Sequence, residues 1–283
     1  MKPMLISTRQ TRPNKAQTRV RHNGTGSIWT HAVWGCLLGL SMALLVWAPA
    51  SWLAWGVTKA SQEQVQWRDV RGTVWSGSAQ LVLSGGKGTL DAQALPGRLQ
   101  WTLLPHWSGV GLSLQADCCM TQESSIQVRL GWSTQHVQVS DNTSQWPAAL
   151  LAGLGAPWNT LQADGQLQLR TESLQLQWAE GRMQMKGLAE LRMQSISSRL
   201  SPIKPIGSYQ LQLRGTPEGT ATPSLQLNTL QGPLLVTGEG QWVGARLRFT
   251  GEAHAQEGYE SALNNLLNIL GRRQGLSTLL SLG

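Results

Sequence analysis

Few segments of this sequence resemble a catalytic or ligand-binding motif. The segment SGGKGT (residues 84–89) looks like a phosphate-binding loop, but Leu81 stands where the first glycine of GxxxxGK[ST] belongs, and Gly88 follows Lys87. A glycine-rich hairpin turn accounts for the segment better. The sequence contains no GxSxG nucleophile elbow. We therefore expect neither a phosphate-binding loop nor a serine nucleophile of this kind.

The other side chains that catalyse reactions or bind metals are scattered. No histidine has a partner at a metal-ligand spacing, and the acidic residues occur singly. We expect His254, beside Glu252, to be a surface neighbour across two strands. The sequence thus predicts no catalytic, cofactor-binding or metal-binding residue, and a protein that is not an enzyme. The five histidines are His22, His31, His106, His136 and His254.

Cysteine usage gives little support for a disulfide framework. Cys36 lies in an apolar segment, and the two others, Cys118 and Cys119, are adjacent. These two could close a vicinal disulfide in an oxidising compartment, but such an eight-membered ring is strained and uncommon. We expect free or partly buried thiols instead.

The formal charge of +8 belongs to the N-terminal tail. Six basic residues fall within the first 22, and the first acidic residue is Glu63, after which 16 basic and 15 acidic residues nearly balance. The tail has no aromatic residue before Trp29, so it lacks the stacking groups of a single-strand nucleic-acid binder. A basic run of this kind is more typical of the flank of a membrane segment, and we expect no nucleic-acid partner.

The membrane segment follows directly. Residues 32–54 (AVWGCLLGLSMALLVWAPASWLA) are long and apolar enough to form one spanning helix, with tryptophans near both ends. The positive-inside rule places the tail in the cytoplasm and the rest of the chain across the membrane. We expect a basic tail at 1–27, an anchor at 28–57 and a β-rich domain at 58–283. The predicted anchor residues are Trp34, Leu38, Leu44, Trp47 and Trp52.

A cleaved signal peptide is the alternative. Ala48-Pro49-Ala50 has the small-x-small form of a cleavage site. The region before the apolar run would be unusually long for a signal peptide, and the apolar run continues past this site, so we favour the uncleaved anchor. Both interpretations place the large domain outside the cytoplasm.

Alternating apolar residues dominate the remainder. In GQLQLRTESLQLQW (165–178) the apolar positions switch parity between Leu169 and Leu174, which predicts a hairpin that reverses at Thr171–Glu172. We also expect Trp178 to pair with Met183, and Leu176 with Met185. A similar sequence, QWVGARLRFTGEAH (241–254), recurs 64 residues after QWAEGRMQMKGLAE (177–190) and predicts a repeated hairpin.

These patterns predict a mainly β fold, built from large antiparallel meander-type sheets with one or two short helices. Leucine and tryptophan build the buried face, and the other face is rich in Gln, Ser and Thr with little charge. The polar face is interpreted as solvated; the alternative is that it receives a partner chain or an amphiphile, because uncharged groups are easier to desolvate.

One amphipathic helix is predicted near the C-terminus, in ESALNNLLNILGRR (260–273). Its leucines recur with helical spacing, and Gly271 would end it. Such a helix most often covers an end of a sheet, but it is also our candidate helix for docking on a partner protein. The leucines in question are Leu263, Leu266, Leu267 and Leu270.

Four segments together resemble protein N of the type II secretion system of Gram-negative bacteria. They are VRGTVWSGSA (70–79), LGAPWNTL (154–161), SSRLSPIKPIGSYQLQLRG (197–215) and LLNILGRRQG (266–275). The resemblance implies an inner-membrane protein with a periplasmic domain that serves the export of folded proteins across the outer membrane. It implies no catalytic residue, no cofactor, and partners among the other inner-membrane components or the exported proteins.

The alternative is a periplasmic lipid-handling protein similar to the AsmA family. There the apolar face would line a groove for acyl chains instead of packing against the chain itself. The two interpretations differ in whether Leu174, Trp178, Met183 and Met185 are covered by other side chains.

Overall fold

The computed structural model describes residues 26–86, 92–131, 134–155, 158–179, 182–216, 222–243 and 246–282, and it divides the chain into two units, Met1–Val46 and Trp47–Gly283. The first unit contains helix α1 (Gly26–Val46). Several segments discussed above lie outside the described residues: the basic tail, Lys87 to Thr89 of the glycine-rich segment, and the central residues of the hairpin turns at 180–181 and 244–245.

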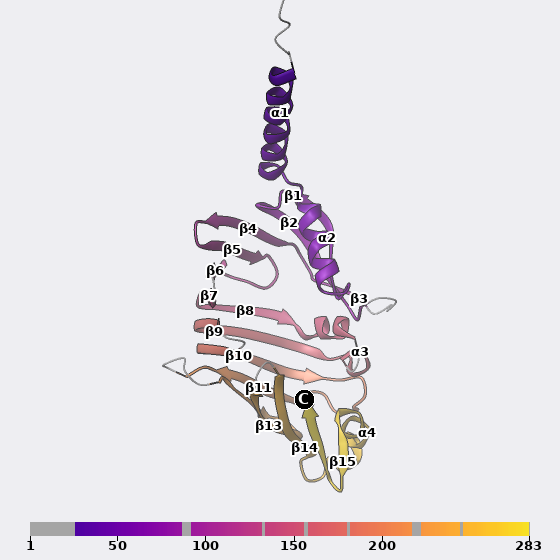
Figure 1. The fold of residues 1–283 in the computed structure, drawn as a ribbon. Helices are drawn as coiled ribbons and strands as arrows, with labels where there is room; N and C mark the ends of the chain where they lie inside the picture. Colours follow the sequence, from indigo (N-terminus) through magenta and orange to yellow (C-terminus); the bar gives the residue numbers. More distant parts are fainter. Residues whose placement is uncertain are drawn as a thin grey trace, which may run out of the picture. The chain divides into compact units, whose positions relative to one another are not determined.

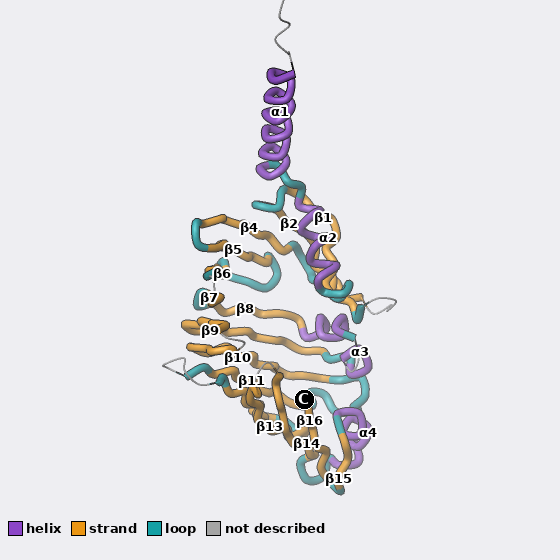
Figure 2. The backbone as a smooth tube through the Cα atoms, in the orientation of Figure 1, coloured by secondary structure: helices purple, strands orange, loops and turns teal. Residues whose placement is uncertain are grey.

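The second unit is built on one antiparallel sheet, which confirms the predicted fold class (Figures 1 and 2). Its path runs β1-β2-β4-β5-β6-β7-β9-β10-β11-β12-β13-β14-β16-β15, with β3 paired to β2 and β8 paired to β9. The strands are β1 (Val65–Gly72), β2 (Ser76–Ser84), β3 (Ala92–Ala94), β4 (Leu99–His106), β5 (Gly109–Ala116), β6 (Ser124–Leu130), β7 (Thr134–Val139), β8 (Asn142–Pro147), β9 (Asp164–Ala179), β10 (Arg182–Ser197), β11 (Gly207–Arg214), β12 (Ser224–Gln231), β13 (Leu234–Val243), β14 (Arg246–Ala255), β15 (Arg272–Gln274) and β16 (Ser277–Leu282).

Four short helices accompany the sheet and lie along one side of it, on the right in Figure 1. They are α2 (Ala50–Ala60), the 3-10 helix η1 (Ala148–Leu154), α3 (Trp158–Leu161) and α4 (Glu260–Leu270). The helix predicted in residues 260–273 is therefore present as α4.

Strand pairing follows the apolar alternation at both predicted repeats. Trp178 pairs with Met183 and Leu176 with Met185 between β9 and β10. Trp242 pairs with Leu247 at the equivalent place between β13 and β14. Directly opposite residues of a pair point to the same face. The apolar residues of these strands therefore share one face, as the pattern predicted.

The hairpin predicted at Thr171–Glu172 was wrong. Strand β9 continues through this point, and Leu169 pairs with Leu191 of β10 instead of with Leu174. The register shifts where Ser173, with φ of 47°, lies opposite Gly187, with φ of 85°. A β-bulge adds one residue to a strand and so swaps its parity without reversing the chain. The sequence pattern alone does not distinguish this bulge from a turn.

The largest part of the core lies between the sheet and α4. Leu263, Leu266 and Leu267 of this helix are buried with Leu234 and Ala253 of the sheet. Each leucine buried in this way stabilises the fold by about 1.5–3 kcal/mol. Two smaller clusters lie around Leu95 and Trp101.

Candidate functional site

Helix α1 contains the first three predicted anchor residues. Trp34, Leu38 and Leu44 are all exposed on it, and its residues Trp29–Val46 have a mean hydropathy of 1.6 with none buried. This is the one helix among the described residues whose length and composition would allow it to cross a membrane.

The single helix predicted through Ala54 is instead two helices. Helix α1 ends at Val46, so Trp47 and Trp52 belong to the second unit. Pro49 explains the break, because a proline disfavours the helical conformation for the residue before it, here Ala48. The proline is visible in the sequence and was a sufficient signal for this break.

Helix α2 has an exposed aromatic side. Ala50 and Ala54 are buried, Ala50 against the cluster around Trp101, while Trp52 and Trp55 are more than half exposed. Trp47, just before the helix, is 80 % exposed. Tryptophan side chains exposed in this way are typical of the interface between membrane and water.

The leucines of α4 are occupied by the chain's own core. Leu263, Leu266 and Leu267 are each at most 1 % exposed, and Leu270 packs partly against the same cluster. They cover the sheet, which is the role expected most often for such a helix. In this structure three of the four candidate partner-binding leucines are therefore not accessible to another protein.

An apolar hollow of about 340 Å³ lies between α4 and the sheet. Trp158, Leu227, Phe249 and Ile269 are among its lining residues, and the few polar ones are mainly serines. Ile269 and Trp158 are partly exposed, at 37 % and 39 %.

The residues chosen to test the acyl-groove alternative lie elsewhere. Leu174 and Met185 are buried, so this part of the apolar face is covered. Trp178 is 37 % exposed, and the side chain of Met183 lies outside the described residues. These covered positions favour packing of the sheet face against the chain itself over an open groove.

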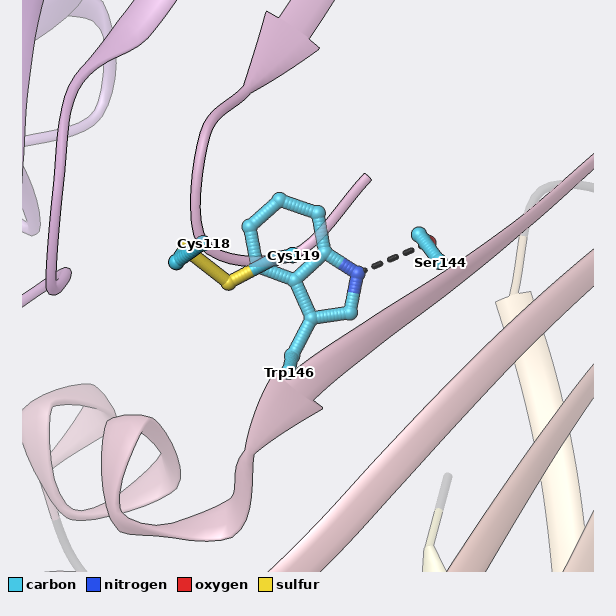
Figure 3. Close-up of a disulfide and its surroundings, with 4 residues drawn as sticks. All are labelled: Cys118, Cys119, Ser144 and Trp146. Atoms are coloured by element: carbon cyan, nitrogen blue, oxygen red, sulfur yellow. Dashed lines mark hydrogen bonds between the residues drawn. A yellow bond between two sulfur atoms is a disulfide. The ribbon is translucent and has the colours of Figure 1, made fainter. Parts of the chain in front are cut away.

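The adjacent cysteines form a disulfide, so the expectation of free thiols was wrong. Cys118 is exposed and Cys119 is buried beside Trp146, whose indole Nε1–H donates a hydrogen bond to Ser144 Oγ at 2.8 Å (Figure 3). The carbonyl of Cys119 accepts a hydrogen bond from Gln145 N at 2.7 Å, which ties the cysteine turn to β8. The pair thus joins the end of β5 to the core. Two adjacent cysteines do not reveal their tertiary surroundings in the sequence.

The acidic residues with perturbed pKa values have structural partners. Asp69 accepts hydrogen bonds from Arg98 and Arg71, and these lower the pKa of its carboxyl. Glu190 is buried, which by itself raises its pKa, but hydrogen bonds from Gln212 and Gln210 and the charge of Arg192 outweigh the burial and lower it. Among the described residues, no three His, Cys, Asp or Glu side chains are grouped to hold a metal ion.

Trp107, in the turn between β4 and β5, is the most exposed aromatic residue among those that the structure describes. It is fully exposed, and Leu104 and Val110 beside it are exposed as well. His106 Nδ1 lies 2.9 Å from Leu104 O. This hairpin tip presents three apolar side chains that the fold does not use. This tip was not among the predicted site residues, although a tryptophan between two alternating strands was a usable signal in the sequence.

Comparison with protein families identifies the family of the chain. A family model described as type II secretion system (T2SS), protein N, matches residues 63–277, more than half of the chain. The chain belongs to this family. No curated protein and no solved structure matches it.

The match to T2SS protein N begins just before β1 and ends in β16. It therefore includes α4 and nearly the whole sheet, while α1 and α2 precede it. All four segments that carried the resemblance lie within it. They fall on the β1–β2 turn, on η1 and α3, on the β10–β11 connection, and on the end of α4.

Proposed function

We propose that this protein is a non-catalytic inner-membrane component of the type II secretion system. Its β unit works in the periplasm through protein–protein contacts and supports the export of folded proteins across the outer membrane. Membership of the T2SS protein N family over residues 63–277 is the observation that carries this proposal.

The proposed location rests on α1 and on the charge before it. Helix α1 has the length and hydropathy of a spanning helix, and six basic residues precede it. Under the positive-inside rule these residues stay in the cytoplasm, which directs the sheet to the periplasm. The mass of the mature protein tests the anchor, because loss of residues 1–50 would mean that the segment is a cleaved signal.

The hairpin tip at Trp107 is the proposed contact with another protein of the secretion system. Exposed tryptophans dominate the binding energy of many interfaces, and removal of one at an interface centre costs about 2 kcal/mol or more. The exposed side chains of Leu104 and Val110 lie on either side of this tryptophan, one on each face of the hairpin, so that apolar surface adjoins it on both faces. The four leucines of α4 are not proposed as contacts, since three of them are buried.

The test is a deletion in the source organism, complemented by the wild-type chain, by Trp107→Ala or by Leu276→Ala. Leu276 is 75 % exposed in another tight turn, between β15 and β16, and serves as the matched control. We expect the deletion and Trp107→Ala to reduce the secreted proteins in the medium, while Leu276→Ala restores them. A photoreactive residue at position 107 should cross-link to a component of the secretion machinery or to an exported protein.

Two results would count against the proposal. Normal secretion in the deletion strain would contradict a supporting role in export. Normal secretion together with altered outer-membrane lipids would favour the AsmA-like alternative.

A further inference from the structure

A polar basin of about 360 Å³ lies on the face of the sheet opposite the apolar core, across β6, β7, β9 and β10. Its lining residues include five glutamines and three basic side chains, and none of them is Asp or Glu. The basic side chains are Arg129, His136 and Lys186. The basin is therefore a site of one sign of charge surrounded by neutral amides.

Strand register fixes how these side chains are arranged. One cross-strand row runs from Arg129 through His136 and Gln177 to Gln184. The parallel row beside it runs from Gln127 to Lys186. Because neighbouring strands lie about 4.8 Å apart, β6 and β10 are separated by about 14 Å. The two terminal cations thus stand at opposite corners of an extended floor.

The second row contains Gln138 and Gln175, which form a direct pair between β7 and β9. Lys186 ends this row and precedes Gly187, the residue opposite the bulge at Ser173. Bulges bend a strand and re-aim nearby side chains, and they are frequent beside binding sites. The bulge therefore accounts for a concave polar face at the point where a flat sheet would offer none.

The basic side chains of the basin have no partner within the described chain. Among the described residues, the side chains of Arg129, His136 and Lys186 make no hydrogen bond and no ion pair. Elsewhere on this face arginines are paired: Arg170 with Glu172, and Arg192 with Glu190. Arg129 and His136 lie directly opposite each other on β6 and β7. No carboxylate among the lining residues offsets the positive charge of Arg129 or Lys186.

We infer that the basin binds an acidic oligosaccharide. The guanidinium of Arg129 and the ammonium of Lys186 donate charge-assisted hydrogen bonds to carboxylate or phosphate groups. Each glutamine amide can both donate and accept hydrogen bonds. Sugar hydroxyls also donate and accept hydrogen bonds, so the two kinds of group are complementary. An extended floor with cations at two corners suits several linked sugars better than one. An acidic peptide would use the cations but would supply few hydroxyls for the amide carbonyls.

The test uses the full chain in nanodiscs of phosphatidylcholine, titrated calorimetrically with trigalacturonic acid. Its fully methyl-esterified form, which has the same backbone without charge, is the ligand control, and a short glutamate peptide represents acidic peptides. We expect the acid to bind, the ester to bind at least about tenfold more weakly, and the affinity for the acid to fall as salt is raised.

Two double variants, each lacking two positive charges, distinguish binding in the basin from a non-specific effect of the protein's net charge. Arg129→Gln with Lys186→Gln should weaken binding by about tenfold or more, because two charge-assisted contacts are removed. Arg246→Gln with Arg248→Gln removes two exposed arginines of β14, outside the basin lining, and should change the affinity less than about threefold. Circular dichroism confirms that each variant is folded.

The inference is overturned if the acid does not bind at millimolar concentration, or if the ester binds equally well. Equal losses in the two double variants would show a non-specific response to net charge. Equal binding of the glutamate peptide would show a site for acidic peptides. None of these results bears on the proposed role in secretion, which the deletion strain tests separately.

Discussion

The burial of α4 can be tested with Leu263→Ala. Leu263 is fully buried and is not among the residues that line the apolar hollow, so we expect its neighbours to relax little when it is truncated. The substitution removes three buried carbons at about 0.8 kcal/mol each and leaves a cavity, for an expected loss of about 3–4 kcal/mol in the free energy of unfolding. Leu266 is equally buried but lines the hollow, so its neighbours already lack some contacts. Leu266→Ala should cost less, about 2–3 kcal/mol.

The assay is urea unfolding of the full chain in a non-ionic detergent, followed by tryptophan fluorescence. Trp146 packs against the same cluster and reports on it. The matched control is Ile269→Ala, since Ile269 lies on the same helix but is 37 % exposed, and it should cost less than about 1.5 kcal/mol. If Leu263→Ala instead unfolds at the same urea concentration as Ile269→Ala and loses contact with a partner protein, the helix is a docking element and the structural assignment is wrong.

Three further predictions concern single sites. Cys119→Ser should lower the stability of the fold by about 1–3 kcal/mol, because it buries a hydroxyl group. Cys118→Ser changes the exposed cysteine of the pair and should cost about 1 kcal/mol. Thermal unfolding compares the two variants. Glu190→Gln should destabilise the protein by about 1–2 kcal/mol at neutral pH. The lowered folded-state pKa of Glu190 contributes stability that is lost as the pH falls through that pKa, so the difference between the two proteins should shrink in acid; urea midpoints measured at a series of pH values from about 7 downward show this. Ser173→Gly should preserve or slightly raise stability, while Ser173→Val should cost about 1–2 kcal/mol, since the backbone at Ser173 has a positive φ; urea midpoints again compare them.

The local part of the fold was predictable from the sequence. Alternation from Met183 to Met193 places these residues on one face without knowledge of their neighbours. Trp178 and Met183 are joined by a short connection, so their pairing follows from the pattern as well. Both are consequences of the two-residue period of a strand, which acts within a few residues.

The candidate sites depend on neighbours distant in the sequence. Gln138 lies beside Gln175 because β7 pairs with β9, and β8 lies between them in the chain. No pattern within either strand specifies this neighbour. The same holds for Cys119 and Trp146, which meet only because the turn after β5 packs against β8. The alternation of apolar residues therefore does not predict how strands that are not consecutive in the sequence pair with one another.

The bulge in β9 connects these observations. Strand β7 pairs with the half of β9 that follows Ser173, and β8 pairs with the half that precedes it. The connection between β7 and β8 contains Asp141, whose Oδ1 accepts a hydrogen bond from Ser173 N at 2.5 Å. The backbone amide of Ser173, at the bulge, thus finds its hydrogen-bond partner in Asp141. Asp141 lies in the connection where β7 ends and β8 takes over as the neighbour of β9. Because the extra residue restores inward-facing Leu174 after Thr171, both halves of β9 keep their apolar residues in the core while the strand bends. The parity switch in the sequence therefore marks the point where the neighbour of β9 changes from β8 to β7. It also marks the point where the polar face of the sheet becomes concave.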